Sequence, residues 1–222
     1  MDRYWTEEEQ ARLLAALRNA PAHHMLARRD DAAIRALLRS GCRVGEFLKV
    51  TVGDAMAALR DGYLFIPREA RKGGKRDHHV FVTAELGRDL RDLLAIRAEL
   101  VPGDCRIEDR LVVGRHGRGI TVRNFELRVK HWARVAGLPP GSSPHWARHT
   151  RGQNIMRRSS ARDPRGVVQK ALGHADIRSS GVYTVTPREE VEAALQEVDA
   201  AGGRRRVTKQ QLRRAYEQRT VL

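Results

Sequence analysis

Apolar residues recur at helical spacing along most of the chain. Thr6 and Glu9 form a capping-box pattern ahead of a first stripe of leucines, and Thr83 stands before a longer one. Gly41 is a plausible helix stop. The pattern therefore predicts a first helix that starts at Thr6. After it, helices are predicted at residues 32–40, 43–50, 83–100, 122–136, 144–157, 164–172 and 188–198.

Two short apolar runs have the character of strands instead. Residues 62–67 are bounded by glycine and proline, and residues 79–82 lie beyond a basic turn at residues 71–76. Together they predict a β-hairpin that carries lysines at its tip. Residues 111–113 fit either a short strand or a buried turn. The expected fold class is therefore α+β, mostly helical, with one small antiparallel sheet.

Composition indicates a globular protein that meets a polyanion. The 222 residues suffice for one well-buried domain, and 41% of them are hydrophobic. The formal net charge is +15, more than solvation of a small domain requires, and nucleic acid is the commonest partner of so basic a protein. The two cysteines lack metal-site spacing and no apolar run approaches a membrane span, so we expect a cytoplasmic, nucleoid-associated protein.

The C-terminal end differs from the rest of the chain. Residues 200–203 read Ala-Ala-Gly-Gly, a linker composition, and residues 201–222 carry seven Lys or Arg against one Glu. Leu212 and Tyr216 have the i, i+4 spacing of a helix. We therefore divide the chain into a domain at residues 1–200 and a basic tail at residues 201–222 that could be helical.

Candidate chemistry begins with a helix that carries two histidines and an arginine. His145 and Arg148 lie three residues apart and share one helix face. His145 and His149 also have the spacing of a zinc helix, but Trp146 takes the place of its general-base Glu. Further along, Tyr183 follows His174 by nine residues. Each of these residues alone would more often be structural.

Their order along the chain changes this interpretation. The chain resembles the tyrosine recombinases, that is, the phage integrases and the Xer-type resolvases, from about residue 5 to residue 187. It fills each position of the family's catalytic pattern, in order: Arg43 with Glu46, Lys72 on the hairpin, His145 and Arg148, His174, and Tyr183. The resemblance implies that residues 1–200 are a tyrosine recombinase catalytic domain.

The chemistry of phosphodiester cleavage accounts for these residue types. Negative charge builds on the non-bridging oxygens of phosphorus, and planar guanidinium groups bind two oxygens at once. Arg43 and Arg148 would do this without a metal or other cofactor, and His145 and His174 would add hydrogen bonds to the same oxygens or take a proton. A covalent intermediate would conserve the bond energy, so no ATP is needed.

The resemblance assigns the remaining roles. Tyr183 would form a 3′-phosphotyrosine, and Lys72, preferred to Lys75, would protonate the leaving 5′ oxygen. Glu46 is expected to be a buried partner that orients Arg43 or His145. The candidate DNA contacts, for which plain solvation is the alternative, are Arg71, Lys75, Arg76 and Arg151. Surface or packing positions are expected for His23, His24, His78 and His79.

The resemblance also implies partners. We expect double-stranded DNA attachment sites, a tetramer on DNA, a tail that docks on a neighbouring subunit, and possible accessory DNA-bending proteins. No separate N-terminal DNA-binding domain precedes the pattern, so the sequence is either part of a longer protein or a short recombinase similar to the fimbrial-inversion enzymes. Two alternatives stay open: a catalytically silent DNA-binding module of the same fold, and an enzyme that nicks and reseals DNA as type IB topoisomerases do.

Overall fold

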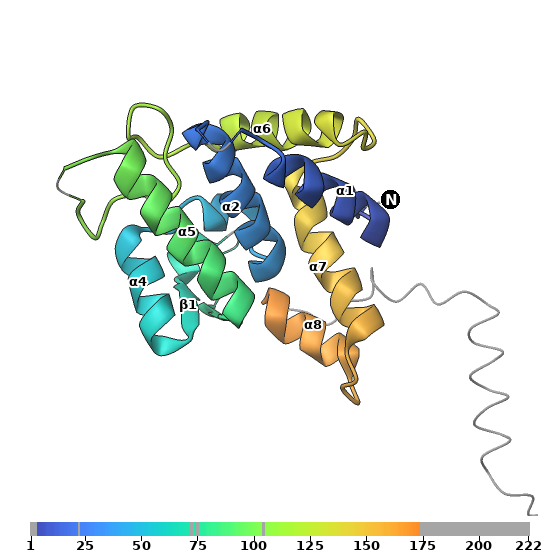
Figure 1. Cartoon of the computed structure of the whole chain (residues 1–222). Coiled ribbons are helices and arrows are strands. Elements are labelled where there is room, and N and C mark those ends of the chain that lie inside the picture. The colour runs from blue at the N-terminus through green and yellow to red at the C-terminus, as the bar shows by residue number, and fades with distance from the viewer. Residues whose placement is uncertain (1–3, 22, 72, 74–75, 104, 174–222) are drawn as a thin grey trace, which may run out of the picture. The chain divides into compact units, whose positions relative to one another are not determined.

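A computed structural model describes residues 4–21, 23–71, 73, 76–103 and 105–173 (Figure 1). The elements in this part of the chain are α1 (Glu7–Arg18), α2 (Met25–Ser40), α3 (Val44–Phe47), α4 (Val52–Asp61), β1 (Tyr63–Ile66), the 3-10 turn η1 (Arg68–Ala70), β2 (His78–Phe81), α5 (Ala84–Leu100), α6 (Val122–Val135), α7 (Pro144–Arg158) and α8 (Pro164–Leu172). Mostly helical and with one small antiparallel sheet, they confirm the expected fold class. The predicted helix at 188–198, the boundary at 200 and the basic tail lie outside the described residues.

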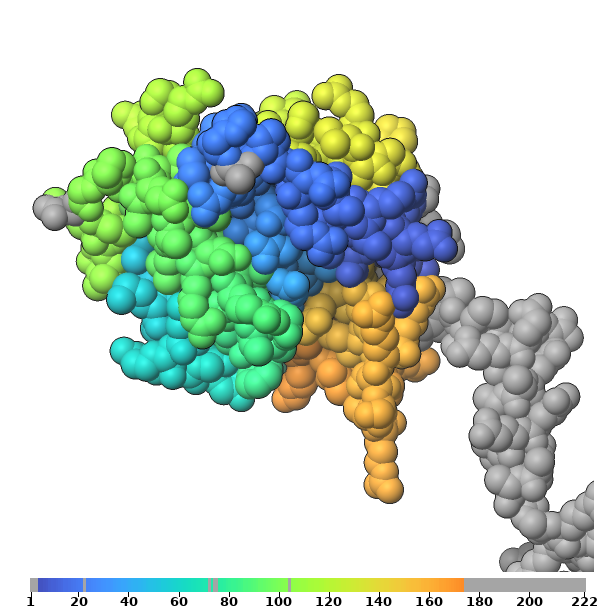
Figure 2. Space-filling model, viewed as in Figure 1, coloured from blue at the N-terminus to red at the C-terminus, as the bar shows by residue number. Residues whose placement is uncertain are grey.

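Helix α2 forms the centre of the described fold. It packs against α1, α5 and α7 (Figure 1), and on the face shown in Figure 2 the side chains of α1 and α5 cover much of it. The predicted apolar positions Ile34, Leu37 and Leu38 are buried there. The helix ends at Gly41, whose φ of 65° is the left-handed conformation expected of a glycine stop.

A buried charge cluster ties α2 to α6. Asp30 is fully buried, and its carboxylate accepts hydrogen bonds from Arg128 Nε at 2.6 Å and from Trp132 Nε1 at 2.9 Å. Its neighbour Arg29 pairs with the same carboxylate and donates to the Val113 carbonyl at 2.9 Å. A buried carboxylate is stable only when partners satisfy it, and here one side chain collects donors from two helices.

The predicted hairpin is confirmed. β1 and β2 pair antiparallel, with Leu64 opposite Val80 and Ile66 opposite His78. These four side chains are buried, whereas the alternate positions of both strands are exposed. β1 contacts α4 and β2 contacts α8, so the base of the hairpin lies beside the end of α8.

Two helices differ from the sequence prediction. α2 begins at Met25, seven residues before the predicted start at residue 32. The apolar pattern missed these first turns because their buried positions include the charged residues Arg29 and Asp30. α4 was not predicted, although Thr51 and Asp54 form a capping box at its start. Its buried face consists of small residues, which give a weak periodic signal.

Smaller differences concern turns and helix ends. α3 is shorter than predicted, at Val44–Phe47, and residues 111–113 form a buried turn in which Val113 makes only an isolated bridge to Gly119. The other predicted helices within the described residues agree with the structure to within a residue or two. None of the described helices has both the length and the apolar character that a membrane span requires.

Candidate active site

Four of the predicted catalytic and supporting residues lie in the described part of the chain, on two separate segments. Arg43 is the N-cap of α3 and Glu46 lies in that helix, whereas His145 and Arg148 lie in the first turns of α7. The predicted DNA contacts Arg71, Arg76 and Arg151 are also described, whereas Lys72, Lys75, His174 and Tyr183 lie outside the described residues. Their predicted roles stay predictions.

Arg148 holds the ends of two helices together. Its side chain is buried, with 3% of the residue exposed. Nη1 donates to the carbonyl of Gly41 at 2.7 Å and Nη2 donates to the carbonyl of Leu172 at 2.8 Å. Both carbonyls lie at helix C-termini, where a cation is favourable. Arg148 thus contacts Gly41, two residues before Arg43, and Leu172, two residues before His174 in the sequence.

Glu46 fixes the position of Arg43. Its carboxylate, in a residue only 2% exposed, accepts hydrogen bonds from the Arg43 backbone N–H at 3.2 Å and from Arg43 Nη1 at 2.9 Å. The sequence left the partner of Glu46 open between Arg43 and His145, and the structure pairs it with Arg43. The Arg43 side chain is 35% exposed, so part of it stays accessible to a ligand.

His145 forms a pair with a histidine that the sequence analysis considered only as a zinc ligand. The Nε2 atoms of exposed His145 and buried His149 are 2.8 Å apart, and the two rings meet edge to face at 83°. For such a contact one ring must donate and the other accept, so at least one imidazole is neutral. Among the described residues, no group of three or more His, Cys, Asp or Glu is placed to hold a metal ion.

His78 lies beside the cationic site and is buried. Burial, and next the charges of Arg71 and Arg148, lower its pKa from 6.5 to about 4, while Glu46 and a hydrogen bond with the backbone of Ala171 act in the opposite direction. The ring therefore stays neutral. The sequence analysis placed His78 among surface or packing residues; the alternation along β2, which puts residues 78 and 80 on the inner face, was the available signal.

The predicted DNA contacts differ in their surroundings. Arg76 is exposed, and its carbonyl accepts a hydrogen bond from Arg71. The Arg71 side chain is only 10% exposed and donates to backbone carbonyls inside the protein. The expectation that Arg71 contacts DNA stays a prediction, and the structure adds two hydrogen-bond partners within the protein.

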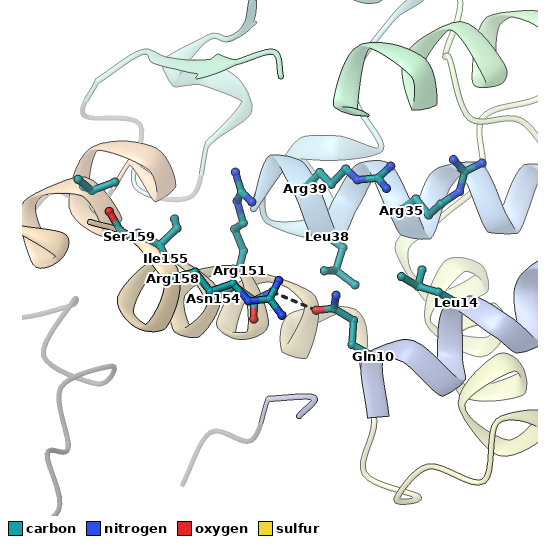
Figure 3. A pocket seen from close by; sticks show the side chains of 11 residues that line it. Gln10, Leu14, Arg35, Leu38, Arg39, Arg151, Asn154, Ile155, Arg158 and Ser159 are labelled. Carbon is teal, nitrogen blue, oxygen red and sulfur yellow. Dashed lines mark hydrogen bonds between the residues drawn. The ribbon is translucent and has the colours of Figure 1, made fainter. Parts of the chain in front are cut away.

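Arg151 lines a cavity of about 390 Å³ between α1, α2, α7 and α8. Figure 3 shows its side chain extending from α7 toward α2, where Arg39 also lines the cavity. Burial, and after it the charge of Arg39, lower the pKa of Arg151 below its usual range. Its predicted DNA contact stays a prediction too, made from a partly buried position.

Comparison with known proteins identifies the class to which this geometry belongs. The model of the phage integrase family matches residues 3–190. Tyrosine recombinase XerC of Ralstonia pickettii is 32% identical over 184 residues, 79% of this chain and 54% of the relative. Tyrosine recombinase XerD of Pseudomonas putida is 33% identical over 175 residues, with coverages of 79% and 54%. The chain thus spans about half the length of the curated relatives it matches.

Solved structures share the fold. The XerH site-specific recombinase bound to its difH substrate in a pre-cleavage complex superposes with a TM-score of 0.69 at 23% identity, covering 87% of this chain and 54% of that one. The XerA recombinase superposes with a TM-score of 0.66 at 21% identity, covering 89% and 63%. At these identities the likeness concerns the fold.

Proposed function

The chain belongs to the phage integrase family, and on that premise we propose that it is the catalytic part of a site-specific DNA recombinase that uses Tyr183 as its nucleophile. The observation that carries the proposal is that packing holds Arg148 against the chain segment that carries Arg43. The two arginines are about a hundred residues apart in the sequence, yet Arg148 donates to the Gly41 carbonyl, two residues from Arg43. Two guanidinium groups held this way suit a phosphate whose charge rises during the reaction.

The proposed reaction is a transesterification. The Tyr183 phenol loses its proton to an imidazole of the site or to water, and its oxygen bonds to phosphorus. The bond between phosphorus and the 5′ oxygen breaks, and that oxygen leaves with the electron pair and takes a proton from the Lys72 ammonium group. Arg43 and Arg148 stabilise the five-coordinate phosphorus, with hydrogen bonds from His145 and His174. One phosphodiester is exchanged for another, so rejoining needs no ATP.

The proposed partners follow from the family. Relatives have been crystallised on DNA substrates, among them XerH on difH and a lambda integrase dimer on a core site. For this chain we propose double-stranded attachment sites, a tetramer on DNA, a C-terminal tail that docks on a neighbouring subunit, and a cytoplasmic location near the nucleoid. Accessory DNA-bending proteins belong to the same proposal.

Covalent capture of DNA tests the function directly. A pool of nicked duplexes with random sequence is incubated with the protein, and duplexes that become covalently attached are recovered and amplified until a preferred site emerges. A nick close to the cleaved phosphate lets the short fragment diffuse away, so the adduct accumulates. We expect a stable adduct with the wild type and none with Tyr183→Phe.

Tyr63→Phe is the matched control, because Tyr63 is half exposed on β1, distant in sequence from the proposed nucleophile. It should capture DNA as the wild type does. If Tyr183→Phe captures as much DNA as the wild type, the nucleophile is misassigned. Binding to the selected site should also weaken with salt by about 0.9 log units per log unit of salt for each phosphate neutralised, and a flat response would contradict the basic interface.

A further inference from the structure

We propose that Arg71 is a positioning residue for strand cleavage, which anchors the hairpin segment before Lys72 to the end of α8 so that the leaving oxygen is protonated in place. This inference rests on the proposed function. It assigns Arg71 a role inside the protein, in addition to or in place of the expected DNA contact.

The Arg71 guanidinium contacts three separate segments of the chain. Nη1 donates to the Arg76 carbonyl on the returning arm of the hairpin at 2.7 Å. Nη2 donates to the carbonyl of Gly173 at the end of α8 at 2.6 Å, a contact between residues 102 positions apart. Nε lies 3.7 Å from Glu46 Oε1, on the carboxylate that also holds Arg43. With 10% of its side chain exposed, Arg71 is placed as an internal tie.

These anchor points are the sequence neighbours of two proposed catalytic residues. Arg71 directly precedes Lys72, and Gly173 directly precedes His174. One planar fork therefore ties together the two described residues that directly precede them in the sequence. A displacement of about 1 Å at a reacting group can cost on the order of 100-fold in rate, so such a tie matters for catalysis even though Arg71 need not touch the substrate.

The side chains of Arg71 and His78 lie so close to Gly173 that a larger residue would not fit there. Gly173 has a φ of 63°, and a Cβ placed on it would lie 2.7 Å from His78 Nδ1 and 2.8 Å from Arg71 Nη2. Only a glycine lets the α8 end approach the guanidinium so closely. The imidazole of His78, kept neutral by a pKa near 4, packs here without adding a further positive charge.

The geometry requires arginine and not merely a cation. A guanidinium presents donors in a fixed plane. In Arg71 it donates to two carbonyls at once while Nε lies at ion-pair distance, without a hydrogen bond, from a carboxylate, whereas the single ammonium of lysine serves one such position well. The buried charge is offset by Glu46 and by the negative end of the α8 dipole. Arg71→Lys should therefore keep the charge but loosen the tie, and Arg71→Met should remove it while keeping most of the packing.

The test compares two forms of the selected suicide duplex in single-turnover cleavage. One is ordinary DNA, and the other carries sulfur in place of the 5′ bridging oxygen at the cleaved phosphate. In the second, the P–S bond breaks and a thiolate leaves, which needs no proton from the protein. We expect Arg71→Met to be slowed about 100-fold on the oxygen substrate and Arg71→Lys by less, with most of either deficit lost on the sulfur substrate. Arg68→Met, an exposed control in the same segment, should match the wild type on both.

The outcomes separate positioning from general damage to the fold. A variant that is only partly folded loses the same fraction of activity on both substrates, so equal deficits on oxygen and sulfur overturn the proposal. A wild-type rate for Arg71→Met on the oxygen substrate overturns it as well. Failure of the proposed function has a different signature: the wild type forms no adduct on either substrate, or Tyr183→Phe forms it equally well.

Discussion

Replacing Glu46 by glutamine tests whether one buried carboxylate organises the cationic site. The carboxylate accepts two hydrogen bonds from Arg43 and lies 3.7 Å from Arg71 Nε, in a residue only 2% exposed. Removing one partner of a buried ion pair costs about 3–5 kcal/mol. Glutamine keeps one acceptor, and the partly exposed Arg43 can regain water. We therefore expect Glu46→Gln to lower the free energy of unfolding by about 2–3 kcal/mol.

Two measurements follow for Glu46→Gln. Urea titration gives the free energy of unfolding, and the melting temperature should fall by about 4–12 °C for a chain of this size. Because Arg43 loses its anchor, cleavage of the selected suicide duplex should slow by up to about 100-fold. Glu85→Gln is the control, since Glu85 pairs with Arg88 at the surface and should change stability by less than about 0.5 kcal/mol. If Glu46→Gln is as stable as Glu85→Gln, the carboxylate does not organise the site.

Three further predictions concern single substitutions. Asp30→Asn should lower the free energy of unfolding by about 3–5 kcal/mol in urea titration, since Asp30 satisfies donors such as Arg128; a loss below about 1 kcal/mol would contradict this. Gly173→Ala should lower it by about 1–3 kcal/mol in thermal melting, because the added Cβ meets Arg71 at a positive φ; unchanged melting would refute that contact. Below pH 6.5 the unfolded chain protonates His78 while the folded protein, with a pKa of about 4, does not, so stability falls as the pH drops from about 6.5 to 4. His78→Leu should reduce this fall by up to about 3 kcal/mol, and identical pH slopes in the two proteins would rule it out.

Much of the secondary structure could be read from local patterns. The capping box at Thr6 and the helix stop at Gly41 depend on residues close in sequence, and both occur as predicted. The apolar pattern failed to predict helical residues where the buried side chains are charged and not hydrophobic. The first turns of α2 bury Arg29 and Asp30, which pair with each other and also hydrogen-bond to distant Val113 and Arg128, so no local count of apolar residues could include them.

For the candidate site, the sequence likewise predicted which residues belong to it but not what they contact. The resemblance to the tyrosine recombinases named Arg43, Glu46, His145 and Arg148, and phosphate chemistry accounts for the cations and proton carriers among them. What these residues contact was not readable: Arg148 donates to carbonyls at Gly41 and Leu172, which only packing brings together.

The sequence by itself thus determined the family, the fold class and the chemical groups on offer, since these depend on residue identity, periodicity and order. Only the tertiary structure decided how those groups are held. It pairs Glu46 with Arg43, joins Arg71 to the carbonyls of Arg76 and Gly173, and buries His78 as a neutral ring beside the cations. The physical reason is that burial, hydrogen-bond partners and pKa depend on segments meeting in space, and a contact across 102 residues leaves no mark in local spacing.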